Sequence, residues 1–365
     1  MSRASGRSAA SRVRPGWCVV ARLAPLLMGV VLLAAPGARA HDVGLDTFLN
    51  WTAPSANNPR TGSAGFALSG SVDVSERWTV FLSGLFLRDF ATRTAETVSA
   101  GSNVFFLSGG AMWLPTNHLM FMAMAMGSPP TVQRSATAVD FGPITADVLF
   151  LGTNASVGGL LLGSYATNGF SKLEHAVDVS VGVNHFRTEQ TVELPQTLRA
   201  NAVRTFCARN DEVGLCPLVN GQAAQLTQVR LGATWVGTVA LKTDVAVDVA
   251  GFLYDSADPA SVGFFTVVQN GRSSDFGSGV PAAPWAFTVR PSVTHRFSKF
   301  SVRGAYQVGL YTGGLGTNHL VSARVTWKAT SWLRLTLSAL LQADVAQRQV
   351  VNRGATLGLG TLFLF

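Results

Sequence analysis

Side chains that could carry out chemistry are few in this chain of 365 residues, and they are spread along it. A hydrolase needs a nucleophile beside a histidine that a third polar group orients. No such motif surrounds the histidines His41, His118, His175, His185, His295 and His319. Asp42, Asp46 and Asp73 also lack the spacing of a calcium-binding loop. We therefore expect no catalytic residue, no metal site and no cofactor, and we predict that the protein is not an enzyme.

The first 40 residues predict export from the cytoplasm. Residues 1–22 carry five arginines and no acidic residue, an apolar stretch follows at 23–35, and Ala38-Arg39-Ala40 has the pattern of a cleavage site. The apolar stretch is too short for a membrane helix, which needs about 20 residues. We expect a signal peptide over residues 1–40, cleaved after Ala40, and a mature domain over residues 41–365.

Removing this segment changes the charge of the protein. The segment holds 6 of the 28 basic residues and none of the 20 acidic ones, so the mature chain carries 22 minus 20, or +2. The basic composition of the full chain therefore gives no reason to expect nucleic acid as a partner. Of the three cysteines, Cys207 and Cys216 lie close together in a polar stretch, and in an exported protein such a pair predicts a local disulfide.

The elements that position these residues are predicted to be β-strands, because apolar and polar residues alternate along most of the chain. In residues 175–186, for example, Val177, Val179, Val181 and Val183 share one face. The segments are about ten residues long, whereas strands of globular proteins usually have five or six. Tight turns alternate with longer polar connections, which we predict near 89–102, 128–156, 188–225, 255–284, 312–318 and 344–352. This layout is typical of a transmembrane β-barrel.

Aromatic residues support the same interpretation. Trp78, Trp113, Trp327 and Trp332 stand next to the short turns, where a girdle at the membrane interface lies in such barrels. The chain ends with GLGTLFLF, an alternating strand whose last residue is Phe365. With its export signal, alternating strands and terminal phenylalanine, the sequence resembles Gram-negative outer-membrane β-barrel proteins. The resemblance implies that Phe365 is read by the barrel-assembly machinery, and that outer-membrane lipid and lipopolysaccharide surround the protein.

We predict an all-β, antiparallel barrel of 14 strands, with 12 as the alternative if residues 43–51 form a plug or tether. Parity supports 14, because bacterial single-chain barrels have even strand numbers. The stretch 144–152 is left in a loop, although it is also compatible with a strand. The predicted strands are 43–51, 64–74, 78–88, 103–113, 118–127, 157–169, 175–187, 226–237, 242–254, 285–297, 300–312, 319–328, 331–343 and 353–365.

Alternation also predicts which side chains face the lumen. One charged set consists of Arg230, Asp244, Asp248, Arg290, Arg303, Arg324 and Arg334. Charged groups on the lipid face cost about 2–4 kcal/mol near the midplane, so these are expected to point inward. Arg290, Arg303, Arg324 and Arg334 lie on neighbouring strands and form a basic wall that favours anions. In the alternative, the arginines pair with Asp178, Asp244 and Asp248 and simply fill the lumen.

A second set is apolar and consists of Met120, Met122, Met124 and Met126, which share one face of the segment 118–127. One hypothesis is a hydrophobic inner wall, as in the long-chain fatty-acid transporter class. The alternative is packing against a loop or the N-terminal segment, since methionine fills gaps readily. The functional prediction is an outer-membrane channel for passive diffusion of small solutes. The alternatives are a carrier of hydrophobic substrates and a surface-interaction barrel that acts through its loops.

Overall fold

The computed structural model describes residues 41–53, 62–90, 92–93, 97–99, 103–140, 145–170, 174–194, 221–256, 284–347 and 349–365. The chain divides into the units Met1–Ala38 and Arg39–Phe365, and all described residues belong to the second. The predicted signal peptide and the predicted disulfide between Cys207 and Cys216 lie outside the described residues. Within the described ranges, no helix has the length and hydropathy needed to cross a membrane.

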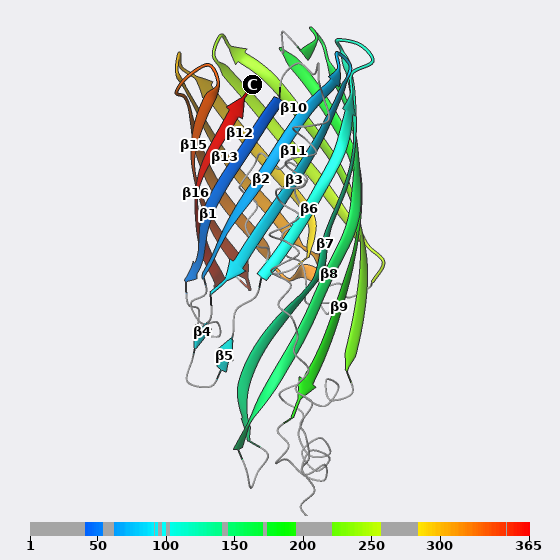
Figure 1. Ribbon diagram of the computed structural model, residues 1–365, viewed down its shortest axis with the longest axis vertical. Helices are drawn as coiled ribbons and strands as arrows, with labels where there is room; N and C mark the ends of the chain where they lie inside the picture. The colour runs from blue at the N-terminus through cyan, green and yellow to red at the C-terminus, as the bar shows by residue number, and fades with distance from the viewer. Residues whose placement is uncertain are drawn as a thin grey trace, which may run out of the picture. The chain divides into compact units, whose positions relative to one another are not determined.

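Fourteen antiparallel strands form a closed barrel, which confirms the predicted strand number (Figure 1). Each strand pairs with its neighbours along the chain, and the first strand pairs with the last, so that no barrel edge is left open. The barrel strands are β1 (His41–Ala53), β2 (Gly62–Ser75), β3 (Trp78–Asp89), β6 (Asn103–Trp113), β7 (Leu119–Asp140), β8 (Thr145–Ala166), β9 (His175–Glu193), β10 (Gln222–Ala240), β11 (Thr243–Tyr254), β12 (Trp285–Arg296), β13 (Phe300–Tyr311), β14 (Thr317–Lys328), β15 (Leu333–Ala346) and β16 (Gln349–Leu364).

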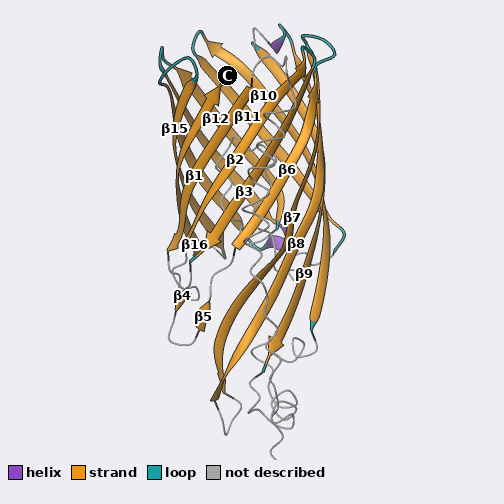
Figure 2. Cartoon of the chain, in the orientation of Figure 1, coloured by secondary structure: helices purple, strands orange, loops and turns teal. Residues whose placement is uncertain are grey.

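Two short strands and a 3-10 turn lie at one end of the barrel. The strands β4 (Thr92–Arg93) and β5 (Thr97–Ser99) form a hairpin within the predicted connection 89–102, and β5 pairs with the far end of β7. The 3-10 turn η3 (Thr312–Gly314) follows β13. Nearly all the described backbone is therefore strand, as the colouring of Figure 2 shows.

The strands β7 and β8 are much longer than predicted. The prediction of a loop over 128–156 is wrong, because residues 128–140 continue β7 and the stretch 144–152 falls almost entirely in β8. The two strands stay paired as far as Asp140 and Thr145, which satisfies their backbone N–H and C=O groups. A polar stretch thus remains a strand where a neighbouring strand supplies its hydrogen bonds. In Figure 1 these strands continue past the ends of β3 and β6.

Two other loop predictions are too long for the same reason. The strands β9 and β10 continue into the predicted loop 188–225, where they pair as far as Gln190 and Gln222. The predicted loop 344–352 is mostly strand, since β15 and β16 pair as far as Ala346 and Gln349. The long connections at this end of the barrel are therefore shorter than the sequence suggested.

A register shift in β7 marks the point where it leaves β6. Pairing between β6 and β7 ends at Leu107 and Gly127. Beyond it, the register between β7 and β8 shifts between Ser128 and Thr131, at Pro129 and Pro130. Proline has no backbone N–H to donate, so it is tolerated at a bulge and on an unpaired edge. The extension of β7 therefore pairs with β8 alone until it meets β5.

Alternate residues face the lumen and the outside, as β9 illustrates. Val177, Val179, Val181 and Val183 are exposed on the outer face. The residues between them are more buried and face the lumen, where Asn184 and Phe186 are 4% and 1% exposed. A large apolar outer face is the feature that a membrane-spanning barrel requires.

Aromatic side chains form a girdle on the outer face of the barrel, at the end with the short turns. Trp78 stacks on Trp113, His175 on Trp235, Phe300 on Trp327, and Trp332 on Phe363, with ring centroids 5.8–6.3 Å apart. On β9, the four outward valines lie between His175 in this girdle and His185, which contacts Thr227 at 3.2 Å. Ten residues rise about 33 Å along a strand, or about 25 Å along the axis at a tilt of about 40°. That height matches the apolar band of transmembrane barrels, which is about 25 Å.

Candidate functional site: the barrel lumen

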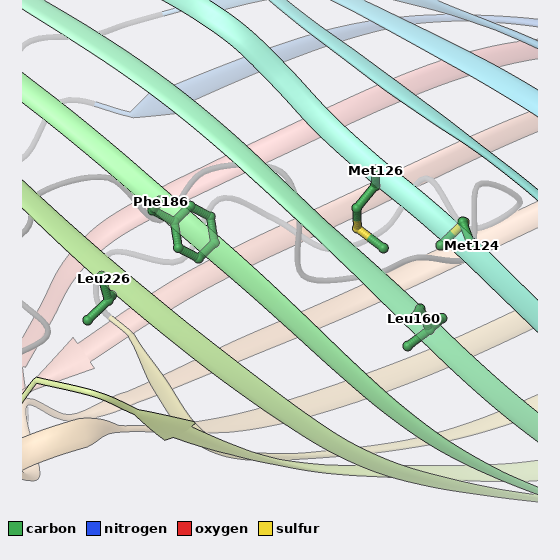
Figure 3. Close-up of a cluster of buried hydrophobic side chains, with 5 residues drawn as sticks. All are labelled: Met124, Met126, Leu160, Phe186 and Leu226. Atoms are coloured by element: carbon green, nitrogen blue, oxygen red, sulfur yellow. The ribbon is translucent and has the colours of Figure 1, made fainter.

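An apolar wall lines the lumen from β3 to β10. Met124 and Met126 on β7 are each 7% exposed and form a cluster with Leu160, Phe186 and Leu226. Figure 3 shows these five side chains on four neighbouring strands, β7 to β10. Met122, Phe81 and Phe106 are partly buried against them. The structure therefore places the predicted methionine row on the lumen face, in contact with further apolar side chains.

Sequence reasoning missed three members of this apolar wall: Leu160, Phe186 and Leu226. Each lies on the lumen face of its strand, because Leu160 pairs with Met124 and Phe186 with Leu226. The available signal was the alternation itself. On β9 the lumen-facing positions Asp178, Ser180, Gly182 and Asn184 are small or polar, and this masks the change to phenylalanine at the next position on that face.

Basic side chains lie on the opposite wall of the barrel, on strands β12 to β15. Arg303 and Arg324 are direct cross-strand partners, and Lys328 and Arg334 form a second such pair on β14 and β15. Arg303 also donates a hydrogen bond to the Ser292 hydroxyl, at 3.3 Å. Like charges directly opposite one another destabilise a sheet unless an anion or a counter-charge lies near. The structure thus brings three of the four predicted wall arginines, Arg303, Arg324 and Arg334, to one wall.

The fourth wall arginine, Arg290, lies close to acidic residues of the neighbouring strand β11. Arg290 is 9% exposed and lies directly opposite Asp248 on β11, whose carboxylate accepts a hydrogen bond from Thr234 at 2.6 Å. Asp244 forms an ion pair with Arg296. These contacts agree with the alternative in which lumen arginines and acids partly neutralise each other.

Two more lumen charges are positioned by small neighbours. Arg230 donates to the Ser180 hydroxyl at 3.0 Å. Asp46 on β1 leans over Gly360 of β16, where a Cβ atom would collide with its carboxylate. Because Gly360 has no side chain, the Asp46 carboxylate can extend across β16 towards β14, where it interacts electrostatically with Arg324. The face of the terminal GLGTLFLF stretch that carries Gly358 and Gly360 therefore lies in the lumen.

A buried polar cluster lies in the lumen near the connection between β15 and β16, and it was not predicted from the sequence. Asp344 is fully buried and accepts hydrogen bonds from Tyr311 at 2.5 Å, Asn318 at 2.6 Å and Gln342 at 3.2 Å. Sequence reasoning missed it because Asp344 fell in the predicted loop 344–352. Its three donors come from β13, β14 and β15, so only the strand register brings them together.

Beyond the end of β11, Asp255 secures the rim of the barrel. Its carboxylate accepts a hydrogen bond from the backbone N–H of Thr227 at 2.8 Å, and its own N–H donates to the Thr227 carbonyl at 3.1 Å. The first of these bonds favours the ionised form and lowers the pKa of Asp255 below its usual value.

Groups suited to metal or acid-base chemistry do not gather in the described ranges. Among those residues, no three His, Cys, Asp or Glu side chains lie together as a metal site. The histidines are dispersed: His118 contacts the Ala166 carbonyl, His295 the Thr243 hydroxyl, and His319 the Tyr306 hydroxyl. The absence of catalytic residues stays a prediction for the chain as a whole.

Comparison with known proteins supports the fold. No protein-family model matches the sequence, and no curated protein matches it. Among solved structures, the CymD monoaromatic hydrocarbon channel has 9% identity and a TM-score of 0.55, covering 90% of this chain and 89% of that one. A Pseudomonas aeruginosa FadL homologue has 10% identity and a TM-score of 0.54, covering 91% and 92%. The Ralstonia pickettii toluene transporter TbuX has 11% identity and a TM-score of 0.52, covering 91% and 90%. The chain therefore has the fold of these outer-membrane β-barrel proteins.

Proposed function

We propose that this protein is an outer-membrane channel that passes small hydrophobic molecules through its lumen, without catalysis. The observation that carries the proposal is the apolar wall around Met124, Met126, Leu160, Phe186 and Leu226. The lumen of a water-filled porin is polar, so a lumen-facing apolar cluster that spans four strands suits a different solute. Covering about 100 Å² of apolar surface on such a wall is worth about 2.5 kcal/mol.

The names of similar structures agree with this cargo. One is described as a monoaromatic hydrocarbon channel and another as a toluene transporter. At about 10% identity these likenesses concern the fold, so the choice of cargo rests on the apolar wall of this chain.

The test is uptake of a hydrophobic fluorescent probe, N-phenyl-1-naphthylamine, by cells that produce the protein. Leu160→Asp puts a charge into the apolar wall and should slow uptake several-fold, because the charge disfavours an apolar solute there. Arg303→Gln on the basic wall is the matched control and should leave uptake unchanged. Equal amounts of folded barrel must be present in the outer membrane. Uptake that is the same with Leu160→Asp would contradict the proposal.

A second candidate is passive diffusion of small anions, which the like-charged pairs Arg303/Arg324 and Lys328/Arg334 favour. In planar lipid bilayers, the reversal potential under a salt gradient reports anion preference. Replacing Arg303 and Arg324 with glutamine should move this potential towards cations and leave folding intact, since the lumen tolerates polar change. A pore without anion preference, or one that the substitutions leave unaltered, would remove this candidate.

A further inference from the structure

Methionine is concentrated on one wall of the lumen. The chain has seven methionines, of which two, Met1 and Met28, precede residue 41. The other five are Met112, Met120, Met122, Met124 and Met126. Register places all five on the lumen face of β6 and β7. Leucine has a similar volume and would serve equally well if the wall needed only apolar bulk. The repeated choice of methionine therefore indicates a role for the thioether sulfur atoms.

The register brings the thioethers within reach of one another. Met112 and Met122 are direct cross-strand partners. Along β7 the methionines follow at every second residue, about 6.7 Å apart. The methionine side chain has three rotatable bonds, so neighbouring sulfur atoms along this row can converge on one ion. Met124 and Met126 also lie opposite the bare positions Gly110 and Gly158, where no side chain from the partner strand competes for space.

An unpartnered oxygen lies at one end of this methionine row. Asn184 on β9 is 4% exposed, and its Oδ1 atom has no hydrogen-bond partner within the described structure. It lies over Gly158, where a Cβ atom would collide with it, and Gly158 is the cross-strand partner of Met126. A buried acceptor without a donor destabilises the folded protein. A cation beside Met126 would satisfy it.

Carboxylates flank the other end of the row. Asp73 accepts a hydrogen bond from Thr79 at 2.5 Å, and Thr79 is the cross-strand partner of Met112. Asp178 accepts one from Ser164, the cross-strand partner of Met120. The basic pairs lie on β13 to β15, away from this wall. The carboxylates therefore favour a cation at this end of the row, and the guanidinium of Arg230, on β10, is held by the Ser180 hydroxyl.

We propose that the five-methionine row binds soft monovalent cations, Cu⁺ or Ag⁺, and that these are a second cargo of the barrel. Thioether sulfur is a soft, neutral ligand that suits Cu⁺ and is poor for Mg²⁺ or Ca²⁺. The ion would enter past Asn184, pass from Met126 to Met120, and leave beside Asp73 and Asp178. This proposal does not depend on hydrophobic transport, since it uses the sulfur atoms and not the apolar bulk of the wall.

The test is Ag⁺ binding to the purified, folded barrel, measured by isothermal titration in a chloride-free buffer. Ag⁺ is used because it resists oxidation, and Cys207→Ser with Cys216→Ser forms the background in which all variants are made. Replacing the five methionines with leucine keeps volume and apolarity while removing every thioether. We expect at least about tenfold weaker Ag⁺ binding in this variant. X-ray absorption of the parent should show sulfur ligands.

Two controls separate the outcomes. Replacing Leu333, Leu335, Leu337 and Leu341 with methionine adds thioethers on β15, away from the row, and should not create comparable binding. Leu160→Asp keeps all five thioethers and should slow uptake of N-phenyl-1-naphthylamine while leaving Ag⁺ binding in place, so loss of hydrophobic transport and loss of silver binding are distinguishable. Equal Ag⁺ affinity in the parent and in the five-leucine variant would overturn the proposal, as would no binding by the parent.

Discussion

A matched pair of substitutions on β11 tests which face of the barrel meets lipid. Val249 faces outward, since its cross-strand partner Ala233 pairs in turn with the exposed Val179, and it lies two residues further from the girdle than Val247, the partner of Trp235. Ala246 faces the lumen, two residues from Asp244 on one side and Asp248 on the other. Val249→Arg and Ala246→Arg therefore introduce the same side chain on opposite faces of one strand.

The expected costs differ strongly. An arginine on the lipid face near the midplane costs about 2–4 kcal/mol, which at 3 kcal/mol is a factor of about 150 in the folding equilibrium. In the lumen the guanidinium is solvated and lies between two carboxylates, so we expect a change below about 1 kcal/mol. The free energy of unfolding would be measured by urea titration of the barrel in lipid vesicles. The heat-modifiable migration typical of barrels would report the folded fraction.

A one-residue slip of register exchanges the faces of the whole strand. If Ala246→Arg destabilised the barrel more than Val249→Arg, the assignment of lumen and lipid faces on β11 would be reversed. Equal losses of stability from both variants would mean that no lipid contacts this part of the wall.

Three further outcomes are expected. Cys207 and Cys216 should resist thiol labelling in oxidised protein, and replacing both with serine should leave barrel stability unchanged; free thiols would contradict the disulfide. Deleting Phe365 should lower the amount of folded barrel in the outer membrane, as judged by heat-modifiable migration, and unchanged assembly would remove its predicted role as a signal. Asp344→Leu leaves the donors of Tyr311, Asn318 and Gln342 unpaired and should destabilise the barrel by about 3 kcal/mol in urea titrations. A loss below about 0.5 kcal/mol would show that water replaces the carboxylate.

Local alternation was enough to predict the strands that cross the membrane. Outward rows such as Val177 to Val183 must be apolar, and the lumen rows between them are smaller and more polar, so the period is visible in the sequence. In the extension of β7, the small residues Ser135, Ala136, Thr137 and Ala138 weaken this contrast. Whether residues 144–152 form a strand depends on the partner 128–140, and composition alone does not reveal that pairing.

The lumen was harder to predict than the strands. Alternation was sufficient to assign the methionine row and the four wall arginines to inward faces. It did not join Leu160, Phe186 and Leu226 into one apolar wall, because each lies on a different strand and the shear between strands sets their level. The cluster around Asp344 likewise depends on register across β13 to β15. Inward direction is a local property, whereas proximity in the lumen is not.

The seam between β1 and β16 has a consequence for the order of assembly. Its contacts join residues about 310 positions apart, as in the hydrogen bond from Thr47 to the Leu359 carbonyl. Closing such a span in an unfolded chain costs about 4 kcal/mol more than closing a two-residue turn, since each doubling of length adds about 0.6 kcal/mol. The hairpins that join neighbouring strands should therefore form first, and the seam should zip last, once the intervening strands have brought its two edges together. A substitution that weakens only the seam would then act on the closing step and let an open, curled sheet accumulate.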